Sequence, residues 1–277
     1  MSDTSAAPVR RHGNLPQQFL QGSGVLWFII AAIGQWMFVV YILGAYIPRT
    51  LGGSFERWNE TGLIDGYVQN DALGNFGFIS HVLLAAFVSA AGVIQLLPMI
   101  RRRFPTFHRW NGRAYMSVAV FLAVGGIILV WVRGTRMNDW AALGTTLDGV
   151  LIVVTAAFTL RHAMARRIDL HRRWAMRLFL VVNGVWFVRV FYMAWAIASG
   201  GAGMHRTMDG PTDILVPYLA FLVPLALLEA YQKARESRSS AFKLGVAGLI
   251  LAGAGVTALG LFGAWMMMWS PNILIFG

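Results

Sequence analysis

Residues 25–46 read VLWFIIAAIGQWMFVVYILGAY, an apolar run without a single charged side chain. A helix needs about 20 such residues to cross the hydrocarbon core of a bilayer. The stretch therefore predicts a membrane-spanning helix. It is also too long for the apolar region of a cleavable signal peptide, so we expect it to remain as the first span.

Six further apolar stretches of similar length follow this one. They lie near 77–100, 114–133, 142–163, 175–198, 213–232 and 244–268. The composition agrees with them, because 57% of the residues are hydrophobic and only 13% are charged, whereas a soluble domain has about 25% charged residues. We expect an all-α, polytopic membrane helix bundle with seven transmembrane helices.

The basic residues predict the orientation of the bundle. Of the 23 Lys and Arg residues, 17 fall in segments on the same side as the N-terminus, five fall on the other side and Arg189 falls inside a span. Basic residues beside the spans are retained in the cytoplasm. We therefore expect a bacterial inner-membrane protein with a cytoplasmic N-terminus and a periplasmic C-terminus. The net charge of +11 is then explained by topology and by anionic lipid headgroups rather than by nucleic acid.

The chain is expected to form one membrane domain. Residues 1–23 are predicted to be a flexible cytoplasmic leader, since the first twenty are rich in Ser, Ala, Pro and Gln. Residues 24–277 are predicted to be the seven-helix domain. The segment between the first two spans is long enough to carry a short surface helix around Phe55 to Leu63.

Two boxes carry the most distinctive chemistry: HRWNGR at His108 to Arg113 and HRRWAMR at His171 to Arg177. Each stands between two apolar stretches, and the pair indicates a weak parallel repeat of 77–133 and 143–199. One interpretation is structural, because Arg and Trp are suited to the membrane interface. The other is that both loops converge on a cationic cytoplasmic pocket for an anionic headgroup or for haem propionates. Its residues would be His108, Arg109, Arg113, His171, Arg172 and Arg177, and His108 and His171 would be the ligands if a haem iron is bound.

Three polar residues fall inside predicted spans, where a charge costs about 2.5 to 3.5 kcal/mol. They are His81, Asp148 and Arg189, all in or near the outer third of the membrane. The structural interpretation is a buried ion pair of Arg189 with Asp148, flanked by His81. The functional interpretation is a ligand pocket in which these groups meet a quinone headgroup.

Several classes of protein lack their signatures here. The chain has no Cys, which excludes disulfides, thiolate nucleophiles and iron–sulfur clusters. It has no HExxH, GxSxG or P-loop motif. A proton-coupled transporter is disfavoured because no inverted repeat is evident. Two hypotheses remain: a small membrane redox or ligand-binding protein of the b-type haem or quinone class, or a non-catalytic accessory or assembly subunit of a larger membrane complex.

The paired boxes also carry a resemblance. His81, Gln95, HRWNGRAY from His108 to Tyr115, HRRWAMR from His171 and Arg189 together resemble a bacterial family of predicted multi-pass membrane proteins of unknown function. The resemblance covers about residues 77 to 195. It implies the fold and the importance of these positions, and it implies no reaction.

Overall fold

The computed structural model describes residues 15–61 and 65–273, and every regular element in those ranges is helical. The longer elements, in chain order, are α1 (Leu15–Leu51), α2 (Ala72–Leu96), α4 (Pro105–Trp131), α5 (Asp139–Met164), α6 (Ile168–Val182), α7 (Gly184–Ser199), α8 (Pro211–Glu236) and α9 (Ser240–Ala264). The short elements are η1 (Phe55–Thr61), α3 (Pro98–Arg103), η2 (Trp265–Trp269) and η3 (Ser270–Asn272). The expected all-α class is confirmed.

Six of the described helices are long and apolar enough to cross a membrane: α1, α2, α4, α5, α8 and α9 with its continuation to Asn272. Large apolar side chains such as Ile33, Leu249 and Phe262 lie exposed on them. Such surfaces are stable against lipid tails, and helices satisfy their own backbone hydrogen bonds there. The chain is a membrane-embedded, multi-pass protein.

The expected fifth span, 175–198, is not one continuous helix. It is divided between α6 and α7, whose axes differ by 56° across the single residue Asn183. Counted as one broken span, the pair gives the seventh crossing; the expectation of an uninterrupted helix was wrong. At the break, Gly184 is in contact with Asp148 of α5, as described below.

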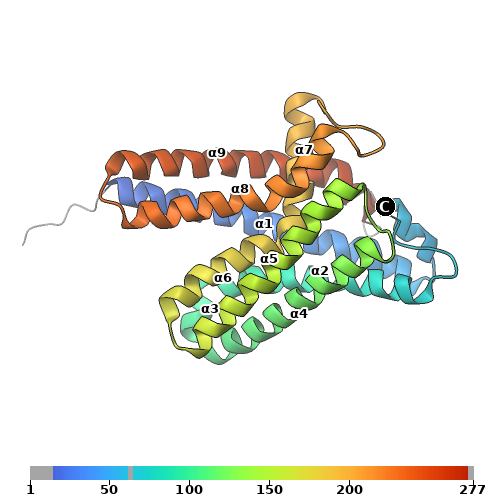
Figure 1. Cartoon of the computed structure of the whole chain (residues 1–277), viewed down its shortest axis with the longest axis horizontal. Helices are drawn as coiled ribbons and strands as arrows, with labels where there is room; N and C mark the ends of the chain where they lie inside the picture. The colour runs from blue at the N-terminus through green and yellow to red at the C-terminus, as the bar shows by residue number, and fades with distance from the viewer. Residues whose placement is uncertain (1–14, 62–64, 274–277) are drawn as a thin grey trace, which may run out of the picture.

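The helices form two groups, shown in Figure 1. α1, α8 and α9 run along the long axis, with α9 packed on both α1 and α8. α2, α4, α5 and α6 make a second, inclined group in which α5 packs on α6 and α2 on α4. α7 crosses the long axis and packs closely on α9. The close approach requires glycine at position 260, since a Cβ there would collide with the carbonyl oxygen of Val190.

The described residues form three buried apolar clusters, of which the smallest joins α1, α8 and α9 through Leu20, Ala234 and Val246. The largest is aromatic and joins α1 to α7 and η2 through buried residues that include Phe38, Phe187 and Trp269. The second lies inside the inclined group and includes Tyr115, Ile152 and Leu178. The bundle therefore has a packed interior on both sides of the broken span.

Two smaller expectations concern the N-terminal third. The surface helix expected around Phe55 to Leu63 is present as η1, and Leu63 itself lies outside the described residues. α1 begins at Leu15, so it takes in residues 15–23 of the segment expected to be a leader. Residues 1–14 lie outside the described range.

Candidate functional site

The chain turns sharply between α2 and α4, and this turn positions the first box. Pro98 begins α3 and Pro105 begins α4, positions where the missing N–H of proline costs no helical hydrogen bond. The short α3 carries three arginines, Arg101, Arg102 and Arg103. His108 then falls in the first turn of α4, beside the last turn of α2.

A side-chain amide network joins the first box to α2. Gln95 Nε2 donates to the carbonyl oxygen of His108 at 3.2 Å and lies 3.4 Å from His108 Nε2. Asn111 Nδ2 donates to Gln95 Oε1 at 2.9 Å and to the carbonyl oxygen of Ala91 at 3.1 Å. Because these bonds are partly shielded from solvent, they fix the His108 ring against α2.

The second box is held by α5 and α8. His171 Nδ1 lies 3.0 Å from the carbonyl oxygen of Thr159, and since a carbonyl only accepts, this nitrogen carries the proton and leaves Nε2 free to bind elsewhere. Trp174 stacks on Phe158 with ring centroids 4.4 Å apart. Arg177 donates to both carboxylate oxygens of Glu229 on α8, at 2.7 and 2.9 Å.

The two boxes meet at one end of the bundle, here named the box end. His108 interacts electrostatically with His171 and with Arg101. Burial, reinforced by the neighbouring Arg172 and Arg102, lowers the pKa of the Arg101 guanidinium. Arg101 and Arg172 therefore form a pair of like charges with the imidazoles of His108 and His171 beside them, and we name these four residues the cationic cluster.

The cationic cluster has little acidic compensation. Within the described residues, Arg172 is the only one of these four residues that forms an ion pair with a carboxylate. Its partner is the exposed Asp169, at 3.8 Å. Such a pair contributes little in water. The cluster thus carries positive charge that an anion from outside the chain would compensate.

The other predicted box residues have partners of their own. Arg109 bonds Thr106 Oγ1 at 3.2 Å, and Arg113 lies 4.8 Å from the centroid of the exposed Trp110 ring. Arg177 is occupied by Glu229. The structure consequently brings together His108, His171 and Arg172 of the six predicted residues, and it adds Arg101.

Two of the three predicted buried residues also lie together. His81 interacts electrostatically with Arg189. The Arg189 Nη1 donates to the carbonyl oxygen of Val185 at 3.0 Å, and its guanidinium carbon lies 5.5 Å from the centroid of the Phe38 ring. His81 Cε1 faces Gly126, where an added Cβ would lie 3.2 Å away.

Asp148 is elsewhere, and the expected ion pair with Arg189 is not among the ion pairs of the described residues. Its side chain is 4% exposed, and its Oδ1 has no hydrogen-bond partner within the described part of the chain. The carboxyl group packs on Gly184, where an added Cβ would collide with Oδ2. Arg189 is five residues further on, about 140° around α7 at 3.6 residues per turn. The Asp148 carboxyl group therefore contacts one side of α7, at Gly184, and Arg189 projects from another side of that helix.

Sequence reasoning missed four contributors: Arg101, Asn111, Thr159 and Glu229. Asn111 lies within the first box and Arg101 within a basic run, but neither pattern predicts a role for these residues. Glu229 was detectable as an isolated acidic residue near the end of a span, opposite a basic box. Thr159 acts through its backbone carbonyl, which has no signal in the sequence.

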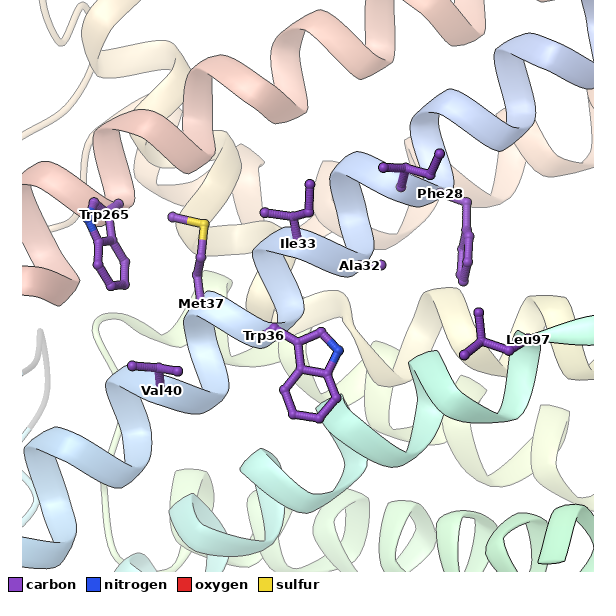
Figure 2. A pocket seen from close by; sticks show the side chains of 9 residues that line it. Phe28, Ala32, Ile33, Trp36, Met37, Val40, Leu97 and Trp265 are labelled. Carbon is purple, nitrogen blue, oxygen red and sulfur yellow. The ribbon is translucent and has the colours of Figure 1, made fainter. Parts of the chain in front are cut away.

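An apolar groove runs beside this site. It has a volume of about 520 Å³ and is lined by residues of α1 together with Leu97 and Trp265. Figure 2 shows the Phe28 ring pointing toward Leu97, Trp36 directed toward α2, and Trp265 on the opposite side of α1. Leu97 also belongs to the turn that carries the cluster, since its carbonyl oxygen accepts from the Arg101 N–H at 3.4 Å.

Within residues 15–61 and 65–273, no group of three or more His, Cys, Asp or Glu side chains is placed to hold a metal ion. A metal bound there would need a cofactor to supply most of its ligands. Two axial histidines satisfy that condition for a haem.

No curated protein and no solved structure matches the chain at a significant level. Residues 78–232, more than half of the chain, match the family described as Predicted membrane protein (DUF2306). This range contains both boxes as well as His81, Asp148 and Arg189. The chain belongs to this family of predicted membrane proteins.

Proposed function

We propose that this is a membrane ligand-binding protein that holds an anionic group at the cationic cluster. The observation that carries the proposal is the convergence of four residues, Arg101, His108, His171 and Arg172. Within the described residues, only Arg172 of the four has an acidic partner, the exposed Asp169. Bringing like charges together costs free energy. A bound phosphate or carboxylate offsets that cost.

The chemistry of the cluster favours an oxyanion over other ligands. The guanidinium groups present planar pairs of donors that match carboxylate and phosphate oxygens. Because the Nδ1–H of His171 donates to the Thr159 carbonyl, Nε2 of the neutral ring is an acceptor, and the donors to the oxyanion are the guanidinium groups. The site therefore provides both charge and directed hydrogen bonds.

The test is retention of an anionic lipid by the detergent-purified protein, measured by native mass spectrometry with phosphatidylglycerol as the probe. Replacing Arg101 with Gln should weaken binding about tenfold, because a hydrogen bond to a charged group contributes about 1.5 kcal/mol. Arg103→Gln is the matched control, since Arg103 is exposed on the same short helix. Equal retention by both variants would contradict the proposal.

A second candidate is a redox protein of the b-type haem or quinone class. For haem, the specific observation is the geometry of His171. Its Nδ1 is oriented by a backbone carbonyl, the usual support for a metal-ligating imidazole, and His108 lies nearby. For a quinone headgroup, the corresponding groups are His81 and Arg189 beside Phe38.

Visible absorption spectra of the oxidised and the dithionite-reduced protein test the haem candidate. A reduced α-band that disappears in both His108→Ala and His171→Ala supports it. His205→Ala is the control, because His205 is exposed and pairs with Asp209. A colourless, folded protein contradicts the haem candidate. Stoichiometric copurification of other membrane subunits with that colourless protein would favour the accessory-subunit hypothesis.

We also propose that the box end faces the cytoplasm of a bacterial inner membrane, because 17 of the 23 basic residues belong to that side in the predicted topology. Because the chain has no Cys, a single introduced cysteine is the only thiol that a maleimide can label, and its labelling shows on which side of the membrane it lies. In intact cells, an impermeant maleimide should label Ala202→Cys and not Ser240→Cys, which lie beyond opposite ends of α8. The reverse labelling would overturn this orientation.

A further inference from the structure

We infer that the groove along α1 holds the apolar chain of an anionic phospholipid whose headgroup phosphate is bound by the cationic cluster. This inference rests on the proposed function and names the ligand class of the same site. Three properties of the groove support it: its continuity with the cluster, its length, and the chemistry of its lining.

Leu97 makes the groove and the cluster continuous. Its side chain lines one end of the groove, and its carbonyl oxygen accepts the backbone N–H of Arg101 at 3.4 Å. Arg101 in turn interacts with Arg172 and His108. One helical turn therefore separates Leu97 in the groove wall from Arg101 of the cluster.

The length of the groove suits one lipid chain. Its α1 lining extends from Phe28 to Val40, which is about 18 Å at 1.5 Å per residue. Half of a bilayer's hydrocarbon core is about 15 Å thick. In Figure 2 Phe28 lies at the Leu97 end and Val40 at the far end, so a chain starting at the cluster would run from the box end toward the middle of the membrane.

The lining is apolar and partly aromatic. It includes Trp36, Met37 and Trp265, with Ala32 in its floor between larger neighbours. The volume of about 520 Å³ falls within the range of about 300 to 1,000 Å³ that is typical of ligand sites. A charged headgroup at one end and an apolar channel behind it match an anionic amphiphile rather than a free anion or a neutral lipid.

The experiment compares three probes on the detergent-purified full chain by native mass spectrometry: palmitoyl-oleoyl phosphatidylglycerol, phosphatidylcholine with the same chains, and glycerol phosphate. Ala32→Phe fills the groove without touching the cluster. Ala252→Phe is the matched control, because Ala252 is exposed on α9 away from the groove. We expect phosphatidylglycerol to be retained over both other probes. Ala32→Phe should weaken that retention about tenfold, and Ala252→Phe should leave it unchanged.

The outcomes distinguish the groove inference from the proposed function. If Arg101→Gln loses phosphatidylglycerol while Ala32→Phe retains it, the proposed function stands and the groove inference is overturned. The groove inference is also overturned if glycerol phosphate binds as tightly as the lipid. If neither variant changes retention, both the inference and the proposed function fail.

Discussion

The two box-bearing helices, α4 and α6, begin alike and end differently. In each, an arginine stacks on the tryptophan three residues earlier, with 4.8 Å between guanidinium carbon and ring centroid: Arg113 on Trp110 and Arg177 on Trp174. Residues three apart share one helix face. The spacing thus permits the same stacking in both helices, whereas Arg189, three residues after Trp186 on α7, lies over the Phe38 ring instead.

The helices diverge beyond the boxes. α4 continues for 27 residues through the adjacent pair Gly125 and Gly126, whereas α6 stops after 15 residues at Asn183. A Cβ on Gly125 would meet nothing within 4 Å, but a Cβ on Gly184 would collide with the Asp148 carboxyl group. Helix-weakening residues alone do not break a span; here the break coincides with a buried carboxyl group packed against it.

The boxes also differ in their counterions. Arg177 has Glu229 of α8 beside it, while Arg113 is exposed and pairs with no carboxylate among the described residues. The difference arises because α6 packs against α8. Identical local motifs thus acquire different electrostatic roles from their neighbours.

The largest effect is expected from Gly184→Ala. The new Cβ would collide with Asp148 Oδ2, and overpacking of this kind destabilises a protein by about 2 kcal/mol. Gly125→Ala is the matched control: it adds the same atom in open space and should be neutral or slightly stabilising. Thermal melting in detergent, followed by size-exclusion fluorescence, measures both.

The same comparison can be sharpened with Asp148. In the double variant Asp148→Ala with Gly184→Ala, the clash is removed, so its destabilisation should be smaller than the sum of the two single effects. If the destabilisations of the two single variants simply add in the double variant, the Asp148 carboxyl group does not clash with the Cβ at position 184.

A smaller effect is expected from Glu229→Gln. It removes the ionic partner of Arg177, whose side chain is 21% exposed while that of Glu229 is 41% exposed. After discounting for solvent screening, the loss should be about 1 kcal/mol. Glu236→Gln is the control, because the pair of Glu236 with Arg173 is more exposed and should change melting very little. If the two substitutions change the melting temperature equally, Glu229 does not stabilise the protein more than the more exposed Glu236.

An effect of similar size that depends on pH concerns the far end of α4, where Arg133 donates to Asp71 Oδ2 at 2.8 Å. The Arg133 guanidinium, helped by the Gly74 N–H, holds the pKa of Asp71 below its ordinary value of 3.8. A lowered folded-state pKa stabilises the protein above the unfolded-state value, and this contribution disappears as the pH falls through the folded-state value.

Asp71→Asn should therefore melt below the parent protein at neutral pH, and the difference should vanish on acidification below about 3.8, the ordinary aspartate pKa. Melting curves of both proteins from pH 7 to strongly acid conditions measure that difference. A gap that stays constant with pH would assign the effect of the substitution to packing rather than to charge.

Much of the fold was predictable from residue patterns. Six of the seven expected spans correspond to single helices, and η1 lies where a surface helix was expected. These features depend on runs of apolar residues and on local spacing. The exception is α6 with α7: Asn183–Gly184 is a local turn signal within an otherwise mostly apolar stretch, but nothing in that segment indicates that Asp148 on another helix packs against Gly184.

The site was predictable only where its residues belong to a local sequence pattern. The boxes identified His108, His171 and Arg172, whereas Arg101 joined them only through the turn made by α3. Glu229 on α8 and the Thr159 carbonyl on α5 come from segments far away in the chain.

The sequence by itself determined that this chain enters a membrane and where its apolar helices lie along the chain, since hydrophobic length and helical periodicity act within one segment. Only the tertiary structure decided which charges meet, which are compensated and which span breaks. Those outcomes depend on contacts between helices that are distant in sequence, and a pattern within one segment carries no information about its neighbours.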